Sequence, residues 1–206
     1  MSRSLNLRIA HPSDSEQIIN LIDSVYQEYD DAVCLDGAEA DLVDLNAYYF
    51  DNGGAFWVLE QNHEQTDVLE IVGTHAAKRD SDNSDVCVFR RLYLANDLRG
   101  TQWGQRLMQI TIDWAKEQGF KRVEFWSDTR FSRAHRFFEK FGFFRKINFG
   151  LAPPQLIRRV AQDRNPDRNF RRSPFFGKIR NFPNHRGQVF QRHYILESIT
   201  TSKPII

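Results

Sequence analysis

Arg99-Gly100-Thr101-Gln102-Trp103-Gly104 stands between a strand-like run and an amphipathic helix. The preceding residues 86–94 are rich in β-branched and aromatic side chains, and Asn96-Asp97 follows them as a turn signal. Behind the hexapeptide, apolar side chains recur at helical spacing until a glycine provides a stop signal: Trp103, Leu107, Met108, Ile110, Ile112, Trp114, Ala115 and then Gly119. The sequence therefore predicts a strand, a glycine-containing loop and a helix in succession.

Such a loop is suited to binding an anion. The first turn of a helix has unpaired N–H groups and the positive end of the helix dipole, and glycine lets a ligand approach the backbone. Two common phosphate loops are excluded, because no glycine is followed by Lys-Ser or Lys-Thr and no Gly-x-Gly-x-x-Gly occurs. The hexapeptide alone also fits an ordinary strand-to-helix turn, so its neighbours must decide between the two interpretations.

A second motif follows one predicted strand later. Residues 122–127 predict that strand, and Ala134-His135-Arg136-Phe137-Phe138-Glu139-Lys140-Phe141-Gly142-Phe143 comes after it. Together with the hexapeptide, this order resembles the GNAT superfamily of N-acetyltransferases. The family's cofactor loop, Gln/Arg-x-x-Gly-x-Gly/Ala, matches here except that Gln102 replaces the first glycine. Its later motif, Ala-x-x-Phe-Tyr-Glu-Lys-x-Gly-Phe, matches except that Phe138 replaces the tyrosine.

The resemblance extends over about residues 5 to 150, with a last strand near residues 189–197. Residues 5–10 predict an opening strand, and a helix follows with apolar Ile18, Leu21, Ile22 and Val25 on one face. Residues 56–60 and 68–75 predict two further strands, joined by a polar turn at 61–66. We expect an α/β fold with a mixed, mostly antiparallel central sheet and flanking helices, the GNAT-like acyltransferase fold, in one domain over residues 1–206.

Composition agrees with one globular domain. The chain has 206 residues, of which 41% are hydrophobic and 27% charged, enough for one good core. It contains no membrane segment, and its first residues lack the apolar core of a signal peptide. Cys34 and Cys87 offer no disulfide framework, and the six histidines lack metal-ligand spacing. We expect a cytoplasmic protein without a metal.

Charge is unevenly distributed although the net charge is only +1. No Lys or Arg occurs between Ile9 and Ala77, and carboxylates crowd the first part of that stretch: Asp23, Glu28, Asp30, Asp31, Asp36, Glu39, Asp41, Asp44 and Asp51. One interpretation is solvated helix faces that balance the basic C-terminal region of the same molecule. The other follows the resemblance, in which this segment borders the acceptor site and would attract a cationic amine of polyamine, aminoglycoside or lysine type.

Residues 151–186 predict a basic, loop-rich insertion before the last strand. Pro153-Pro154, Asn165-Pro166, Ser173-Pro174 and Phe182-Pro183 mark it as loop. Its arginines alternate with phenylalanines, a composition suited to phosphate contacts and base stacking. A cap over the sheet or a homodimer interface explains the same composition, and no recognisable nucleic-acid motif occurs. We therefore do not expect a nucleic acid partner, and a homodimer stays an open alternative.

The resemblance implies acetyl-CoA as acyl donor and a small-molecule or peptide amine as acceptor. It places Leu92, Tyr93, Leu94, Arg99, Gly100, Thr101, Gln102, Trp103, Gly104 and Phe138 at the cofactor. A backbone N–H near Tyr93 and Leu94 would stabilise the tetrahedral oxyanion. Two residues also have plainer explanations, since Trp103 fits the first core anchor of its helix and Tyr93 fits a packing residue.

Acetyl transfer needs a neutral amine, yet alkyl amines have a pKa near about 10.4, so a base must remove a proton. The candidates are His75, Glu124 and His135. His75 lies near the end of a predicted strand, where a histidine with satisfied partners is the favoured explanation. Glu124 should lie on the opposite sheet face from Val123 and Phe125, toward the acceptor or toward solvent. His135 lies on a helix, where a surface position fits as well.

Phe138 leaves two functional classes open. The resemblance implies a tyrosine at that position that protonates the departing sulfur, and losing such an acid costs about 10² to 10⁴ in rate. A thiolate, whose conjugate acid has a pKa near about 8.5, still leaves without help, so an active N-acetyltransferase is compatible with phenylalanine. The alternative is a non-catalytic acyl-CoA-binding regulatory module of the same fold.

Overall fold

The computed structural model describes residues 4–63, 68–146, 191–197 and 199, and these form one seven-stranded sheet in the order β1-β2-β3-β4-β5-β7-β6. The strands are β1 (Ser4–Ile9), β2 (Ala55–His63), β3 (Val68–Arg79), β4 (Val86–Leu94), β5 (Arg122–Asp128), β6 (Phe144–Lys146) and β7 (Gln191–Glu197). Only β4 and β5 run parallel, and all other neighbouring pairs are antiparallel. The expected mixed, mostly antiparallel sheet is confirmed.

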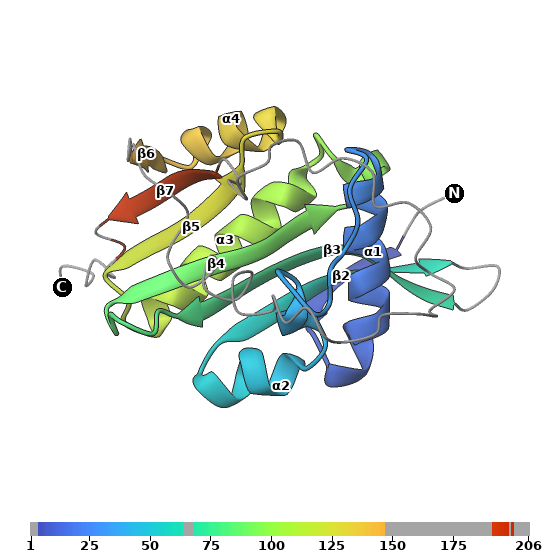
Figure 1. Cartoon of the computed structure of the whole chain (residues 1–206), viewed down its shortest axis with the longest axis horizontal. Coiled ribbons are helices and arrows are strands. Elements are labelled where there is room, and N and C mark those ends of the chain that lie inside the picture. Colours follow the sequence, from blue (N-terminus) through green and yellow to red (C-terminus); the bar gives the residue numbers. More distant parts are fainter. Residues whose placement is uncertain (1–3, 64–67, 147–190, 198, 200–206) are drawn as a thin grey trace, which may run out of the picture.

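Helices cover both faces of this sheet (Figure 1). The α-helices are α1 (Ser15–Gln27), α2 (Leu45–Tyr48), α3 (Gln102–Glu117) and α4 (Ser132–Lys140), and the short 3-10 turns are η1 (Pro12–Asp14), η2 (Ala40–Leu42), η3 (Phe50–Asn52) and η4 (Asn96–Leu98). On the face of α1 and α2, Ile18, Ile22 and Leu45 pack against Phe56 and Val58 of β2. On the opposite face, side chains of α3 and α4 join strand residues in a second core: Leu107, Met108, Phe138, Phe89 and Phe125.

Most predicted elements are confirmed, with differences at their ends. The strand over residues 86–94 and the stop at Gly119, which has a left-handed φ of 78°, agree with the sequence. The predicted turn at residues 61–66 begins too early, because Gln61, Asn62 and His63 still pair with residues 68–70 of β3. The 4-residue α2 and the 3-residue β6 were not predicted, since such short segments show too little periodicity. The predicted insertion at 151–186 lies outside the described residues.

A β-bulge interrupts the pairing of β3 with β4 beside the predicted site. Thr74 lies opposite Tyr93, but Ala76 lies opposite Arg90, so β4 holds one extra residue. The extra length is absorbed at Arg91, whose φ of 58° is left-handed although the residue is not glycine. The side chains of Arg90 and Arg91 consequently both reach Asp41, on the face covered by α1.

None of the helices in the described part of the chain is long and apolar enough to cross a membrane.

Candidate active site

β4 and β5 stop pairing and diverge where the predicted site begins. Their parallel pairing joins only Val86–Val88 to Arg122–Glu124, although β4 continues to Leu94 and β5 to Asp128. β4 stays paired to β3 on its other side, where the Ala95 N–H donates to Val72 O at 2.9 Å. Bonding directions alternate along an antiparallel pair, so the N–H of Leu94 points away from β3, toward the side that β5 has left.

Leu92 presents its N–H in the same direction. The carbonyl of Arg91 accepts a hydrogen bond from Thr74 Oγ1 of β3 at 2.8 Å. In a planar trans peptide the C=O and the following N–H point in opposite directions, so the N–H of Leu92 faces away from β3. Tyr93, by contrast, lies opposite Thr74 in the hydrogen-bonded register, which directs its N–H to β3. Among the predicted backbone donors, the geometry therefore favours Leu92 and Leu94.

The loop after β4 ends in a capped helix start. Gly100 has a φ of 82°, a left-handed conformation that explains the glycine at this position. Thr101 is the N-cap of α3: its Oγ1 accepts from the Trp103 N–H at 3.3 Å and donates to Leu98 O at 2.6 Å. The N–H groups of Gln102 and Gly104 have no acceptor within the helix, and they are the donors that an anion would meet.

Gly104 allows α3 to approach its neighbours closely. A Cβ at this position would lie 3.3 Å from Leu94 Cδ1 and 3.7 Å from the ring of Phe137 on α4. A larger residue at this position would require the Leu94 side chain to shift by a few tenths of an ångström, so Gly104 suits the close packing of β4, α3 and α4. Trp103 is partly buried against Leu98 and neighbouring core residues, as expected of a helix anchor.

Arg99 is engaged within the protein. Its guanidinium makes a bidentate pair with Glu28, at 2.5 and 2.7 Å, and Nε donates to Leu94 O at 2.9 Å. The hydrogen bonds from Arg99 lower the pKa of Glu28. A phosphate that is to bind this guanidinium must displace the carboxylate of Glu28, a partner that the sequence does not indicate.

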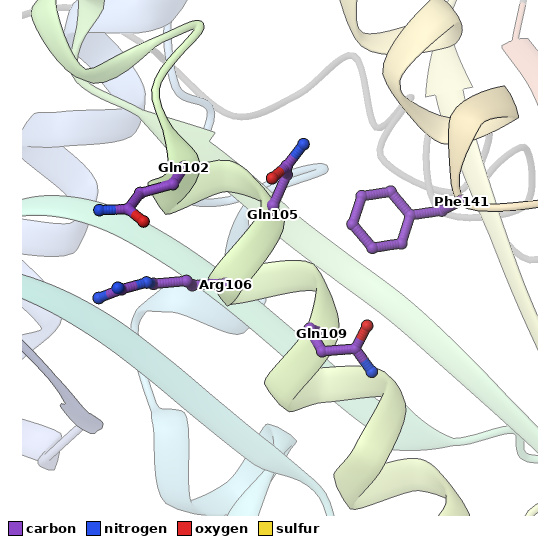
Figure 2. A pocket seen from close by; sticks show the side chains of 5 residues that line it. All are labelled: Gln102, Gln105, Arg106, Gln109 and Phe141. Atoms are coloured by element: carbon purple, nitrogen blue, oxygen red, sulfur yellow. The ribbon is translucent and has the colours of Figure 1, made fainter.

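A shallow, solvent-open groove of about 310 Å³ runs beside α3. Its walls are residues on the exposed side of that helix together with the ring of one aromatic residue after α4: Gln102, Gln105, Arg106, Gln109 and Phe141. Figure 2 shows Gln109 extending toward Phe141, while Gln102 and Arg106 leave the helix on the other side. Because Gln102 is the first residue of α3 and helical, the position does not require glycine.

His75 is a core residue. Its ring is buried among α3 and β4 side chains, with Nδ1 at 2.8 Å from Thr111 Oγ1 and 3.2 Å from Leu107 O, and it packs edge-on against Phe89. Burial lowers the pKa of His75 to about 4, and the hydrogen bond to Leu107 O opposes this only in part. The geometry favours a histidine with satisfied partners over a base in contact with an acceptor.

His135 also lies inside the protein rather than at its surface. Its Nε2 is 2.9 Å from Asp128 O, and its Nδ1 is 2.6 Å from Arg192 of β7. Burial and the nearby charge of Arg192 lower the pKa of His135. This side chain links α4 to the ends of β5 and β7.

Glu124 lies on the opposite sheet face from Val123 and Phe125, as predicted, and therefore on the face of α1. Its Oε2 is 2.8 Å from His193 Nε2 of β7, and its Oε1 is 2.6 Å from Arg122 Nε. The ring of His193 stacks on Trp126, with 4.6 Å between ring centroids and 8° between planes. Of the three candidate bases, only Glu124 lies on the face of α1. His193 is a partner of Glu124 that the sequence analysis missed.

Phe138 is part of an aromatic cluster. Its ring centre is 4.5 Å from that of Phe125 and 5.3 Å from that of Tyr194, and only 6% of the residue is exposed. The phenylalanine thus fills core space between α4 and the sheet.

Three carboxylates between α1 and α2 are paired with an arginine of β4 and an arginine of the loop after β5. Arg91 contacts both Glu39 and Asp41, and Arg130 after β5 pairs with Asp31 at 2.7 Å. Although burial would raise the pKa of Asp41, the charges of Arg91 and Arg90 lower it to about 2. Glu39, Asp41 and Asp31 are thereby neutralised by arginines outside the basic insertion.

No group of three or more His, Cys, Asp or Glu side chains within the described ranges is arranged to hold a metal ion. Cys34 is exposed and Cys87 buried, both as free thiols.

The comparisons with known proteins agree on one protein family. The sequence model described as "Acetyltransferase (GNAT) family" matches residues 20–143. The curated relative "Probable N-acetyltransferase camello" of Xenopus laevis is 30% identical over 118 residues, which are 57% of this chain and 50% of that protein. The chain therefore aligns with about half the length of this relative.

Solved structures share the fold at low sequence identity. A GNAT-family acetyltransferase of Staphylococcus aureus superposes with a TM-score of 0.66 at 22% identity, over 94% of this chain and 99% of that one. A Salmonella typhimurium structure, yncA with its cofactor acetyl-CoA, gives a TM-score of 0.58 at 13% identity, over 94% and 93% of the two chains.

Stability should fall as the pH drops from about 6.5 to about 4. The folded-state pKa of His75 lies below its unfolded value, so between these pH values the unfolded chain binds a proton that the folded protein does not. The contribution of neutral His75 to the free energy of unfolding is fully present above pH 6.5 and is lost as the pH falls toward 4. It amounts to about 3 kcal/mol at most. Chemical denaturation at a series of pH values should show that the free energy of unfolding changes less steeply with pH in His75→Gln than in the native protein.

If the free energy of unfolding depends on pH equally in His75→Gln and in the native protein, a depressed pKa at His75 is contradicted.

Proposed function

The chain belongs to the GNAT acetyltransferase family, and we propose that it transfers an acetyl group from acetyl-CoA to the nitrogen of an amine. The observation that carries the proposal is the divergence of β4 and β5 next to the start of α3, with the N–H groups of Leu92 and Leu94 directed into it. A thioester placed there would have its carbonyl oxygen within reach of backbone donors and its phosphates at a helix N-terminus.

The cofactor would lie along α3. The N–H groups of Gln102 and Gly104 would bind the diphosphate, and the amide of Gln102 adds a further donor at the same end of the helix. The groove beyond them suits the adenosine end, since Phe141 supplies a ring for stacking and Gln109 extends toward the same side of α3. Acetyl-CoA thus serves as the acyl donor.

In the proposed reaction the acceptor nitrogen attacks the thioester carbonyl carbon, and a C–N bond forms. The carbonyl oxygen becomes an oxyanion, which the N–H of Leu92 would stabilise, with Leu94 as the neighbouring donor along the strand. Collapse of this intermediate breaks the C–S bond and releases the thiolate of coenzyme A. Because Phe138 has no proton to give, the thiolate would leave without a side-chain acid from that position.

Glu124 is the base that the geometry supports best. An amine acceptor is a cation at neutral pH because its pKa is near about 10.4, and a carboxylate both attracts it and takes its proton. Glu124 lies opposite Val88, four residues before Leu92, about 13 Å along the strand, so the proton would reach it only through a chain of several waters. His193, hydrogen bonded to Glu124, holds the carboxylate and offers a second place for the proton.

The proposal is tested by measuring thiol release from acetyl-CoA with a panel of polyamines, aminoglycosides and lysine peptides. Turnover with at least one of these acceptors supports an N-acetyltransferase. Tight coenzyme A binding by calorimetry without any turnover would instead support the non-catalytic acyl-CoA-binding module.

Glu124→Gln should lower turnover by about 10² to 10⁴ near neutral pH while leaving acetyl-CoA binding unchanged, because it removes the base and keeps the shape. The deficit should shrink as the pH rises, since the fraction of neutral amine increases tenfold per pH unit below its pKa. Rate profiles against pH check this.

Glu60→Gln is the matched control for Glu124→Gln, because Glu60 is also a carboxylate of the sheet paired with an arginine, Arg8, but lies on β2. A loss at Glu124→Gln of the same size at every pH would show that the residue does not act on the amine proton.

Phe138→Tyr should raise turnover by several-fold up to about 10², because a phenol there can protonate the departing thiolate. The neighbouring Phe137→Tyr is the control, and thermal unfolding records any cost of placing a hydroxyl in the aromatic cluster. Unchanged turnover in a folded Phe138→Tyr protein would refute proton delivery to sulfur as the limiting step.

Glu28→Gln should tighten coenzyme A binding by about threefold to tenfold, because it removes a negative charge near the phosphate site and frees the guanidinium of Arg99. Calorimetry at two salt concentrations checks this, and the gain should shrink at high salt. Asp31→Asn is the control, since that carboxylate pairs with Arg130 instead. Weaker binding by Glu28→Gln would mean that the pair supports the loop and does not compete with phosphate.

A further inference from the structure

Arg91 combines two properties that are seldom found together in a strand. Its φ of 58° is left-handed, a conformation that non-glycine residues adopt rarely, and its side chain is buried. It stands immediately before Leu92, whose N–H is the proposed oxyanion donor. Unusual backbone conformations of this kind persist only where the surroundings hold them, and they cluster at functional sites.

The side chain of Arg91 is held by the segment around η2. Its Nε donates to Asp41 Oδ2 at 3.1 Å, and a second nitrogen donates to Asp41 Oδ1. Nη1 donates to Glu39 at 3.3 Å and Nη2 to Ala38 O at 2.7 Å. These contacts fix the guanidinium against the segment that connects α1 to α2.

The main chain of Arg91 is held as well, by a residue of the neighbouring strand. Thr74 Oγ1 of β3 donates to its carbonyl at 2.8 Å, and the hydroxyl of Thr74 is itself fully buried. This bond sets the plane of the peptide that joins Arg91 to Leu92. A rotation of that peptide would turn the Leu92 N–H away from the gap between β4 and β5.

We propose that Arg91 is a positioning residue for acetyl transfer, whose ion pairs with Asp41 and Glu39 hold the bulge of β4 so that the Leu92 N–H points at the thioester carbonyl. The inference rests on the proposed function and adds a residue that does not touch the substrate. It also connects the acidic segment before α2 to the reacting carbonyl, which gives its buried carboxylates a role in catalysis.

Arg91→Gly is the first test, because glycine accepts the left-handed φ while losing every side-chain contact. We expect kcat to fall by about 10 to 10² while KM for acetyl-CoA changes less than about threefold, since losing a full oxyanion donor costs about 10² to 10³. Arg8→Gln is the control: it breaks a comparable cluster with Asp14 and Glu60 on β1, away from the site, and should lower thermal stability without changing kcat.

Thr74→Val is the second test and keeps the ion pairs of Arg91 intact. It removes only the hydroxyl that holds the Arg91 carbonyl, and it should lower kcat by about 3 to 10 with acetyl-CoA binding preserved. Thr74→Val therefore tests the positioning role of Arg91 even if Arg91→Gly does not fold. A kcat equal to that of the native protein in Thr74→Val or in folded Arg91→Gly overturns the proposal.

A spectroscopic measurement separates this inference from the proposed function. Isotope-edited infrared spectra of bound acetyl-CoA should show the thioester carbonyl shifted to lower frequency in the native protein, and nearer to its free value in Thr74→Val. This readout requires no acceptor amine and no turnover. If no amine is acetylated but the shift is present and lost in the variant, the proposed reaction fails while the positioning role stands. An identical shift in both proteins refutes the positioning role.

Discussion

The incomplete pairing of β4 with β5 is the constraint on which the rest of the site depends. Three residue pairs join the two strands, and beyond them each strand turns to a different helix, β4 to α3 and β5 to α4. Unpaired strand edges are normally covered or protected, because free N–H and C=O groups invite pairing with other chains. Here the unpaired donors of β4 face a gap beside a helix N-terminus, where a thioester with attached phosphates would satisfy them.

The end of α1 joins both sides of this gap. Glu28 pairs with Arg99 in the loop after β4, and Asp31 pairs with Arg130 in the loop after β5. Between them, Tyr29 packs edge-on against Phe131, with ring centres 4.9 Å apart. Exposed ion pairs contribute only about 0 to 1 kcal/mol each, so their importance lies in holding the two loops at a fixed separation rather than in stability. Two of the carboxylates that the sequence presents as an attraction for ligands, Glu28 and Asp31, are used for that purpose.

Local patterns made the fold predictable, whereas contacts between distant segments did not. β4, the glycine loop and α3 follow from residue types and spacing, and strand alternation places Glu124 on the correct face. His193 lies 69 residues from Glu124, and Glu28 lies 71 residues from Arg99, so neither partnership has a local signature. The left-handed Arg91 is equally invisible, because the sequence signal for that conformation is glycine or asparagine. The burial of His75 depends on how α3 packs on β3, and it reduces that residue's suitability as a base.

The two departures from the family motifs affect parts of the site that backbone groups can replace. Gln102 is a helical residue at the first position of α3, where its peptide N–H is available whatever the side chain. Phe138 removes a side-chain acid, an effect worth about 10² to 10⁴ in rate, but a thiolate is a stable enough leaving group to depart alone. Oxyanion stabilisation is commonly the larger contribution, and the donors proposed for it belong to the main chain, which no substitution of Leu92 or Leu94 other than proline can delete. Catalytic competence in this chain therefore depends more on the conformation of β4 than on the identity of its motif residues, which makes the buried contacts of Arg91 more informative about activity than the missing tyrosine.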